Sequence, residues 1–270
     1  MRHIPVTLSR ALMKYYLGPD HPLKIRIWNL ALRTMGYPKL TIPFHQGKIA
    51  LDLRDLVQRE ILVNGDYEPE VWEAISPYLQ NGDVVYDIGA HVGSFSVKAS
   101  GDSRVKRVLS FECCTPTLEQ LRLNQKLNSA RFEINAFAIG EKRGEMSLTW
   151  GEVENWGRSS LVLDRDSTKK ETVPVRSLDE LVEQEGFPVP NIIKMDIEGG
   201  EKSALAGATK TLARPEVRAL VFESAQENRK VTDSSLSKIL TDRGFRIEYI
   251  PRPGQADSEF GNFLATKVSL

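Results

Sequence analysis

Residues 84–93 read Val-Val-Tyr-Asp-Ile-Gly-Ala-His-Val-Gly, and this stretch decides which fold we predict. Residues 84–88 have the apolar composition of a short buried strand, with Asp87 near its carboxyl end. Gly89 and Gly93 bracket a tight turn into a helix, where missing side chains let a ligand approach backbone N–H groups. The stretch is typical of the ligand-binding strand–turn–helix unit of an α/β protein.

A second acidic residue follows at the distance expected for a nucleoside site. Residues 105–111 (Val-Lys-Arg-Val-Leu-Ser-Phe) predict the next parallel strand, and Glu112 lies at its tip. In nucleoside-binding folds, a carboxylate about 20 residues after the glycine turn holds the ribose hydroxyls. The turn together with Glu112 predicts that the chain binds an adenosine-like ligand.

The spacing of the glycines distinguishes between two kinds of adenosine-containing cofactor. A dinucleotide-binding turn has the pattern G-x-G-x-x-G, which lets the pyrophosphate rest on the helix N-terminus. Here Gly89 and Gly93 are too far apart, no third glycine follows, and Asp87 precedes the turn. A carboxylate there would repel a pyrophosphate but suits the ammonium and sulfonium groups of S-adenosylmethionine. We therefore expect S-adenosylmethionine as cofactor and S-adenosylhomocysteine as product.

Strands and helices alternate along most of the chain, which favours a parallel sheet with helices on both faces. Besides the two strands above, we expect strands at 49–53, 131–137, 191–195, 217–222, 245–250 and 260–268. Helices are expected at 69–79, 92–99, 116–128, 200–213 and 232–243. The last two strands have no helix between them, so they should form a hairpin and give the sheet one antiparallel strand.

Four blocks of sequence resemble the FkbM-type methyltransferases, a class I S-adenosylmethionine-dependent family, over roughly residues 47–268. The blocks are Asn-Gly-Asp-Tyr-Glu-Pro-Glu at 64–70, the turn at 87–93, Phe-Glu at 111–112, and Ile-Lys-Met-Asp-Ile-Glu-Gly-Gly-Glu at 193–201. The last block is the most specific. The resemblance implies a Rossmann-like, doubly wound, seven-stranded sheet, in agreement with the alternation of elements. The chain departs from the family at His91, where Asn is usual.

The composition excludes several classes of function. Lys and Arg number 36, as do Asp and Glu, so no net field attracts nucleic acid or an anionic membrane. The two cysteines, Cys113 and Cys114, are neighbours and form neither a disulfide framework nor a metal-binding spacing. No apolar run reaches the roughly 18 residues of a membrane span, and the N-terminus lacks a signal-peptide core. We expect a cytoplasmic enzyme with no transmembrane segment and no nucleic-acid partner.

Residues 1–46 differ from the methyltransferase domain, which we place at 47–270. Within the first segment, residues 22–35 predict an amphipathic helix that ends at Gly36. This segment could pack on the core, form a lid over the acceptor pocket, or mediate a homo-oligomer. Its basic residues leave contact with a membrane surface as a further alternative.

Residues 140–172 interrupt the alternation of strands and helices. A long insertion in a compact domain is usually functional or mobile. Within it, Trp156 lies beside polar residues and could stack on a sugar ring or an apolar acceptor. The alternative is an ordinary hairpin with a mobile charged loop.

Three acidic residues gather after the strand at 191–195. Methyl transfer to a hydroxyl requires alignment of donor and acceptor and gains from a general base at the carboxyl edge of the sheet. Asp196 ends the strand and is the first candidate for this base. Glu198 and Glu201 could bind the acceptor, or could instead cap the next helix. Lys194 shares the face of Asp196, so a salt bridge between them is expected.

Glu223 ends the next strand and should face the same cleft. It could be the base, a hydrogen-bond acceptor for the substrate, or a cap for the following loop. A divalent metal held by Asp196, Glu223 and a third oxygen ligand is an alternative. Because no dense acidic motif is present, we predict that no metal is required.

The remaining candidates concern the cofactor. His91 could act as a base or contact the methionine carboxylate, or it could simply hydrogen-bond the backbone. Glu68 could approach the cofactor or serve as an acid at a helix start, and Asn135 could bond the adenine amine. The expected cofactor contacts are Glu68, Asp87, Gly89, Ala90, His91, Gly93, Glu112, Asn135, Ala136 and Asp196.

These observations predict an S-adenosylmethionine-dependent O-methyltransferase. The resemblance implies that its acceptor is a hydroxyl of a sugar or of a polyketide-like natural product. N-methylation of a small amine, a nucleotide-binding oxidoreductase and a non-catalytic cofactor-binding interaction protein are the alternatives. The intact acids Asp87, Glu112 and Asp196 argue against the last, because a site without chemistry should lose them.

Overall fold

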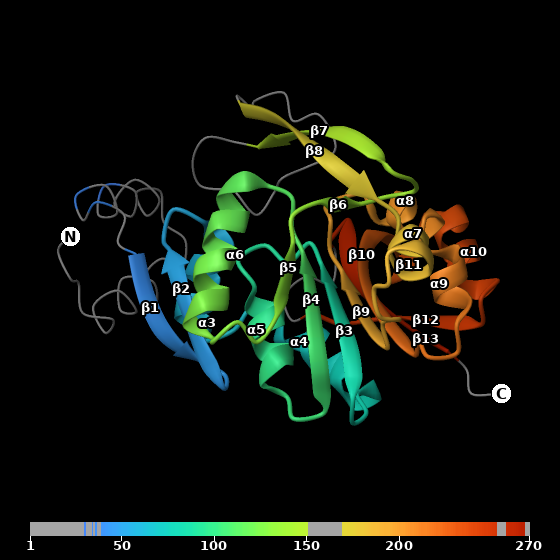
Figure 1. The fold of residues 1–270 in the computed structure, drawn as a ribbon, viewed down its shortest axis with the longest axis horizontal. Helices are drawn as coiled ribbons and strands as arrows, with labels where there is room; N and C mark the ends of the chain where they lie inside the picture. The colour runs from blue at the N-terminus through green and yellow to red at the C-terminus, as the bar shows by residue number, and fades with distance from the viewer. Residues whose placement is uncertain are drawn as a thin grey trace.

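The central sheet alternates with helices as the sequence predicts (Figure 1). Its strand order is β12-β13-β10-β9-β3-β4-β5, and β11 pairs with β10 beside this path. The bounds are β3 (Asp83–Ile88), β4 (Val105–Phe111), β5 (Glu133–Asn135), β9 (Ile192–Met195), β10 (Ala219–Glu227), β11 (Lys230–Val231), β12 (Phe245–Tyr249) and β13 (Phe260–Lys267). The strands from β10 to β5 pair in parallel, whereas β13 lies antiparallel between β10 and β12. The predicted seven-stranded, mostly parallel sheet is confirmed.

The computed structural model describes residues 30, 34, 36, 39–150, 169–252 and 258–267. Most of the helix predicted at 22–35 lies outside these residues, although Leu30 and Thr34 are helical. Trp156 also lies outside them, so its predicted contact with the acceptor stays a prediction. Within the described part of the chain, no helix has both the length and the apolar character needed to cross a membrane.

Helices cover both faces of the sheet and enclose two cores. One face packs against α3 (Leu56–Asn64), α4 (Pro69–Ile75), α5 (Ser94–Gly101) and α6 (Thr115–Leu127). The other packs against α7 (Leu178–Gln184), α8 (Glu201–Ala206), α9 (Thr209–Ala213) and α10 (Ser234–Thr241). Alternate residues of a strand point to opposite faces, so Val85 belongs to the first core and Tyr86 to the second.

A β-hairpin precedes the sheet and was only half predicted. The strand expected at 49–53 is β2 (Gly47–Asp52), which pairs antiparallel with β1 (Lys39–Phe44). The hairpin packs against α5 and α6 on the first face (Figure 1). The predicted boundary between residues 46 and 47 therefore falls in the turn of this hairpin.

Other elements differ in their bounds from the prediction. The helix expected at 69–79 ends as α4 at Ile75 and continues as a 3₁₀ turn over Ser76–Tyr78. The helix expected at 200–213 is two helices, α8 and α9, separated at Gly207. A Cβ atom at Gly207 would lie 2.2 Å from the carbonyl oxygen of Gly140, so this close approach requires glycine between the two helices. Helices α3 and α7 were not predicted.

The insertion at 140–172 contributes a separate small sheet. Its strands are β6 (Ala138–Ile139), β7 (Gly144–Trp150) and β8 (Lys169–Arg176), in the order β6-β8-β7. β7 and β8 form an antiparallel hairpin, as the alternative reading of this segment predicted. The strand expected at 131–137 is correspondingly shorter, because it ends as β5 at Asn135.

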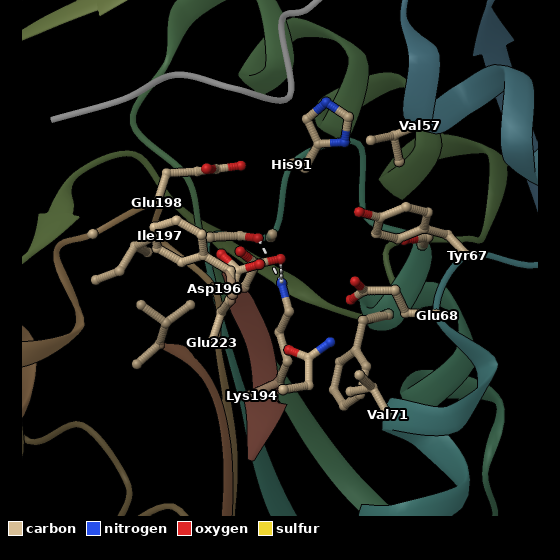
Figure 2. A pocket seen from close by; sticks show the side chains of 18 of the residues that line it. Val57, Tyr67, Glu68, Val71, His91, Lys194, Asp196, Ile197, Glu198 and Glu223 are labelled. Atoms are coloured by element: carbon tan, nitrogen blue, oxygen red, sulfur yellow. Dashed lines mark hydrogen bonds and ion pairs between the residues drawn. The ribbon is translucent and has the colours of Figure 1, made fainter. Parts of the chain in front are cut away.

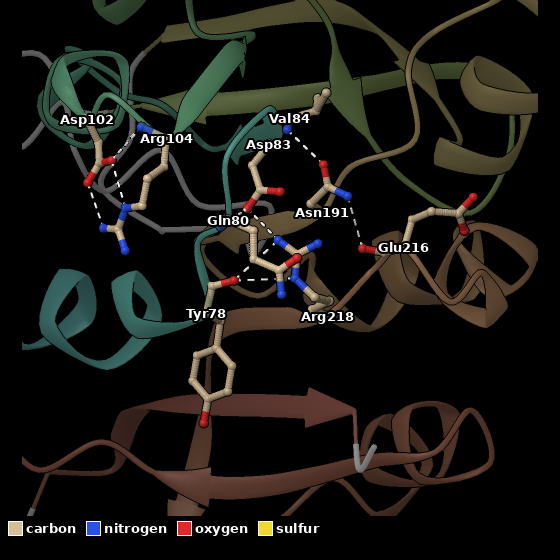
Figure 3. A network of polar contacts seen from close by, with 9 residues as sticks. All are labelled: Tyr78, Gln80, Asp83, Val84, Asp102, Arg104, Asn191, Glu216 and Arg218. Carbon is tan, nitrogen blue, oxygen red and sulfur yellow. Dashed lines mark hydrogen bonds and ion pairs between the residues drawn. The ribbon is translucent and has the colours of Figure 1, made fainter. Parts of the chain in front are cut away.

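The amino edge of the central sheet is held by polar contacts (Figure 3). The Arg218 guanidinium, just before β10, pairs with Asp83 and donates to the Tyr78 carbonyl at 3.2 Å. The Asn191 amide, just before β9, accepts a hydrogen bond from the Val84 N–H at 2.8 Å. These contacts tie the starts of β3, β9 and β10 together.

Candidate active site

A cleft with a volume of about 1130 Å³ opens at the carboxyl edge of β3, β4, β9 and β10. Open α/β sheets bind ligands at this edge. Ligand pockets usually measure about 300–1,000 Å³, so the cleft has room for a nucleoside cofactor and a small acceptor. The charged residues that line it include Glu68, His91, Glu112, Asp196, Glu223 and Arg252.

The turn after β3 is shaped by the loops that touch it. Gly89 has a φ of +77°, and a Cβ atom there would lie 1.8 Å from the carbonyl oxygen of Asp196. The N–H groups of Gly89 and Ala90 both donate to the Phe111 carbonyl, at 2.9 and 3.0 Å. Both residues line the cleft, but their N–H groups serve the junction with β4. This corrects the expectation that these N–H groups face a ligand.

Gly93 and Asp87 lie behind this turn and do not line the cleft. A Cβ atom at Gly93, where φ is +89°, would lie 2.6 Å from Leu121 Cδ1, so this glycine is required by packing against α6. The Asp87 side chain is fully buried, and its Oδ2 accepts a 2.5 Å hydrogen bond from the Ser96 hydroxyl. Burial raises the pKa of Asp87, and Lys194 opposes that rise. Asp87 and Gly93 thus support the turn from behind, and their predicted contacts with the cofactor stay predictions.

Lys194 joins the acidic ends of two strands (Figure 2). Its Nζ donates to the Gly89 carbonyl at 2.9 Å and lies 3.6 Å from Asp87 Oδ1 and 3.5 Å from Asp196 Oδ2. The expected salt bridge with Asp196 is confirmed. Burial acts to lower the pKa of Lys194, but Asp196 and Asp87 outweigh it and raise that pKa above its ordinary value. Lys194 therefore stays charged.

The loop after β9 places its three acids differently. Asp196 and Glu198 line the cleft, and the Asp196 side chain is 27% exposed. Glu201 is buried, and its two oxygens accept hydrogen bonds from the Ile197 and Gly199 N–H groups at 2.8 and 3.0 Å. Glu201 thus shapes the loop before α8 and lies outside the cleft lining, and its predicted contact with the acceptor stays a prediction.

Glu112 lines the cleft at the tip of β4. Its Oε2 accepts a hydrogen bond from the His91 N–H at 2.8 Å, and its Oε1 accepts from the Cys113 and Cys114 N–H groups at 2.9 and 2.8 Å. Burial raises the pKa of Glu112, although the Cys114 N–H and His91 oppose that rise. A carboxylate offers about four lone-pair positions, and the three N–H groups occupy three of them, so Glu112 can accept one further hydrogen bond, from a ligand hydroxyl.

Two further acids in the cleft have pKa values near neutrality. Burial, reinforced by the charges of Asp196 and Glu198, raises the pKa of Glu223 to about 8. Burial and Asp196 likewise raise the pKa of Glu68 to about 7, with Arg252 opposing. A general base is most effective when its pKa lies near the working pH. Glu223 meets this condition and carries no cationic partner among the described residues.

Arg252, just after β12, was not predicted as a site residue. Its Nη1 donates to Glu68 at 2.9 Å, its Nη2 donates to Glu60 at 3.0 Å, and its Nε lies 3.3 Å from Glu70. The guanidinium also lies 5.6 Å from the centre of the Tyr67 ring. Glu60 is 192 positions away in the sequence, so no local pattern could indicate this cluster.

His91 pairs with a second residue that was not predicted, Asp55. Asp55 is buried and caps α3, where its Oδ1 accepts a hydrogen bond from the Gln58 N–H at 2.9 Å. Its Oδ2 lies 3.6 Å from His91 Nε2. Burial acts to lower the pKa of His91, but Asp55 and Glu112 outweigh it and raise that pKa. The His91 ring therefore lies near the Asp55 carboxylate, whereas the structural alternative predicted a hydrogen bond to the backbone.

The predicted adenine contacts at the end of β5 lie outside the cleft. The Asn135 carbonyl accepts a hydrogen bond from the Glu112 N–H at 3.2 Å, and Ala136 is exposed. Phe137 and Ala138 line the cleft in their place, because β5 ends earlier than expected. On the opposite wall, the unpredicted Phe260 of β13 presents a half-exposed ring to the cleft.

The acids of the cleft are spread over separate strands and loops. Within the ranges that the structure describes, no group of three or more His, Cys, Asp or Glu side chains could hold a metal ion.

Comparison with known proteins links this cleft to a family. The sequence profile of the methyltransferase FkbM domain matches residues 87–247, which is more than half of the chain. The chain is 24% identical over 181 residues to the hexuronic acid methyltransferase AglP of Haloferax volcanii, covering 67% of this chain and 71% of AglP. It is 23% identical to the AMB antimetabolite synthetase AmbE of Pseudomonas aeruginosa, covering 77% of this chain but 12% of AmbE.

Among solved structures, the FkbM methyltransferase of Methylobacillus flagellatus is similar, with 21% identity and a TM-score of 0.47. The match covers 78% of this chain and 52% of that one. The chain thus spans about half the length of that methyltransferase and a small part of AmbE.

Proposed function

Because the chain belongs to the FkbM methyltransferase family, we propose that it transfers a methyl group from S-adenosylmethionine to a hydroxyl of a sugar or similar natural product. One observation carries this proposal. A single cleft combines Glu112, at the position for a ribose-binding acid, with Glu223, an acid whose pKa of about 8 suits a general base. The name of the relative AglP, a hexuronic acid methyltransferase, supports a sugar as the class of acceptor.

The residues of the cleft suit S-adenosylmethionine better than a dinucleotide. Glu112 can accept a hydrogen bond from a ribose hydroxyl, and Phe137 offers an apolar surface to the adenine ring. The carboxylates of Glu68 and Asp196 are complementary to an ammonium and a sulfonium. A pyrophosphate would meet these same carboxylates and be repelled.

The chain's own residues supply alignment and a proton acceptor. S-adenosylmethionine, when bound, supplies an electrophilic methyl group and leaves as S-adenosylhomocysteine. Glu223 would accept the proton of the acceptor hydroxyl during transfer of the methyl group to the hydroxyl oxygen. Lys194 holds Asp196 in place to accept a hydrogen bond from the acceptor. Alignment of the two reactants supplies much of the remaining rate enhancement.

Two measurements test this proposal. Calorimetry should show binding of S-adenosylhomocysteine and no binding of NAD at the same concentration. A panel of hydroxylated sugars, assayed by release of S-adenosylhomocysteine, should then identify acceptors. Binding of NAD alone would contradict the cofactor assignment, and turnover confined to non-sugar compounds would contradict the acceptor class.

N-methylation of an amine is the second candidate, because the wall formed by Glu198, Glu223 and Glu259 is acidic and would also hold an amine. Glucose and glucosamine are a matched pair for this question, since they differ by one amino group. The carbon chemical shift of the transferred methyl group distinguishes an O-methyl from an N-methyl product.

A further inference from the structure

The cleft offers few positions for a ligand carboxylate. Three side chains that carry or can carry positive charge line it within the described residues, namely His91, Lys194 and Arg252. Lys194 already lies within ion-pair distance of Asp87 and Asp196. Arg252 lies within ion-pair distance of three glutamates. An added carboxylate at either cation would face two or three carboxylates, so the net interaction there would be repulsive.

His91 differs from the other two cations. Among the described residues, only the Asp55 carboxylate lies within ion-pair distance of its ring, at 3.6 Å from Nε2. The Glu112 carboxylate is bound to the His91 backbone N–H instead, and its effect on the ring is smaller than that of Asp55. An imidazolium has a second N–H donor at Nδ1, so one partner leaves the other donor for a ligand. The side chain is 18% exposed and borders the cleft (Figure 2). Asp55 in turn is fixed as the cap of α3, and this fixes the position of the carboxylate that faces His91.

The proposed cofactor brings a carboxylate that needs such a partner. The methionyl end of S-adenosylmethionine, and of its product, carries one carboxylate and one ammonium. Figure 2 shows His91 at one end of the pocket and Glu68 and Asp196 farther along it. A zwitterion lying between them would meet a cation at one end and anions at the other.

We propose that His91, held by Asp55, binds the methionyl carboxylate of the cofactor. This inference rests on the proposed use of S-adenosylmethionine, and it goes beyond that proposal by assigning a recognition residue for one end of the ligand. It also removes His91 from the candidate general bases, because an imidazolium has no lone pair to accept a proton.

The charges around His91 predict how binding depends on pH. Asp55 before α3 and Glu112 after β4 favour the imidazolium form of His91. Burial and Lys194 on β9 oppose it. Two other titratable residues, Tyr67 and Glu68, line the same cleft. The net effect raises the pKa of His91. Affinity for a carboxylate ligand is therefore highest below that pKa and falls as the pH rises through it, because the charge of His91 is lost there.

The test compares two ligands and two proteins by calorimetry. S-adenosylhomocysteine carries the methionyl carboxylate, and 5′-methylthioadenosine lacks it. The substitution His91→Asn removes the positive charge, and asparagine tolerates the φ of +50° at this position. We expect His91→Asn to bind S-adenosylhomocysteine about 10- to 100-fold more weakly at low pH, the range for a charged hydrogen bond, with no change for methylthioadenosine.

The ratio of wild-type to His91→Asn affinity isolates the titration of His91. Glu68 and Glu223, with pKa values of about 7 and 8, titrate in both proteins and largely cancel in this ratio. The ratio should fall towards one as the pH rises, by up to about tenfold per pH unit. Asp55→Asn retains the helix cap, because Asn caps as well as Asp, but lowers the pKa of His91. In the Asp55→Asn protein, the pH at which the affinity ratio falls should be lower. A purely structural role of His91 would not produce this shift.

Each outcome decides the matter. Equal affinities of wild-type and His91→Asn for S-adenosylhomocysteine at low pH would overturn the inference alone, and so would equal weakening of both ligands. A wild-type protein that binds neither ligand would overturn this inference together with the proposed function.

Discussion

Glu112 uses one carboxylate for two tasks at the scale of a single residue. Its carboxylate accepts hydrogen bonds from three backbone N–H groups of the two loops that border it, and it lines the cleft. The three contacts fix the carboxylate before a ligand arrives, so a ribose would meet acceptors that are already oriented. This arrangement favours a binding role over a structural one alone.

Glu112→Gln should weaken binding of S-adenosylhomocysteine by about 1–3 kcal/mol, the range for losing a charged hydrogen bond. Glutamine keeps the shape of the side chain and one acceptor oxygen, which limits damage to the loops. Calorimetry gives the affinity, and a thermal melt reports whether the fold is intact. Glu133→Gln, at an exposed residue of β5, is the matched control. An unchanged affinity in a folded variant would rule out the ribose role.

Glu223 and Asp196 compete for the role of general base, and the structure favours Glu223 because its pKa is about 8 and Asp196 faces Lys194. Glu223→Gln should slow turnover about 10²- to 10⁴-fold and leave affinity for the cofactor largely intact. A base acts when deprotonated, so wild-type turnover should rise with pH up to about 8 and level off above it. Asp196→Asn should slow turnover by a smaller factor. Normal turnover by Glu223→Gln, with a slow Asp196→Asn, would return the role to Asp196.

The residues that could be predicted from sequence are those at strand ends. Asp196, Glu112 and Glu223 follow apolar runs, and parallel strands bring such ends to one edge. Asp55 and Arg252 were missed because their partners come from other elements, far away in the sequence. The sequence left the role of Glu201 open for a different reason, since only the folded loop shows that the Ile197 and Gly199 N–H groups donate to its carboxylate.

At the scale of elements, the central strands and the helices between them follow from hydrophobic periodicity. β1 shows why other elements were missed. Its residues alternate between exposed and buried, but Pro43 lies within it, and proline argues against a central strand. Among the described strands β1 pairs only with β2, so it lies at an edge, where proline is tolerated. The need for glycine at position 207 likewise comes from the close approach of the distant Gly140, which no local pattern reports.

The β1–β2 hairpin depends on the fully buried Asn124 of α6. Its Oδ1 accepts a hydrogen bond from the Ala50 N–H at 2.7 Å, and its Nδ2 donates to the Val92 carbonyl at 2.7 Å. One side chain thus ties β2 to the turn that lines the cleft.

Asn124→Ala should lower the free energy of unfolding by about 1–3 kcal/mol, because it leaves buried backbone groups without partners. Chemical denaturation measures the change. Arg122→Ala, at an exposed position of the same helix, is the control and should change stability far less. Equal effects of the two substitutions would show that the Asn124 contacts contribute little.

At the scale of the whole molecule, the carboxylates of the cleft are distributed over several elements. Asp196 follows β9, Glu223 belongs to β10, and Glu68 precedes α4. Hard cations such as Mg²⁺ and Ca²⁺ require several oxygen ligands gathered around one point. A base and aligned reactants are sufficient for transfer from a sulfonium. The arrangement therefore favours a reaction that needs no metal.

We expect activity to survive incubation with EDTA followed by removal of the chelator. Turnover before and after treatment, with and without added Mg²⁺, measures this. Activity that is lost with EDTA and restored by Mg²⁺ would contradict the expectation, and would make Asp196 a candidate metal ligand instead of a hydrogen-bond acceptor.

The charge of the cleft also differs from the charge of the chain. Lys and Arg balance Asp and Glu over the whole sequence, but one wall of the cleft carries Glu198 in the loop after β9 and Glu259 just before β13. Glu223 of β10 adds a further negative charge to this wall above its pKa of about 8. The nearby Arg252 is paired with three carboxylates. An anionic acceptor would be repelled by this wall, whereas a neutral sugar would not, so we expect the acceptor to lack negative charge.

A matched pair of acceptors tests that expectation against the acidic substrate named for AglP. A methyl hexoside should be methylated about tenfold more efficiently, in kcat/KM, than the corresponding uronic acid, which equals about 1.4 kcal/mol of repulsion. The preference should shrink at high salt, which screens charges, and in Glu259→Gln, which removes one. Glu227→Gln, at an exposed residue outside the cleft lining, should leave the preference unchanged. A preference for the uronic acid would contradict this expectation, and would mean that a cationic side chain outside the ion pairs described above binds the carboxylate of the acceptor.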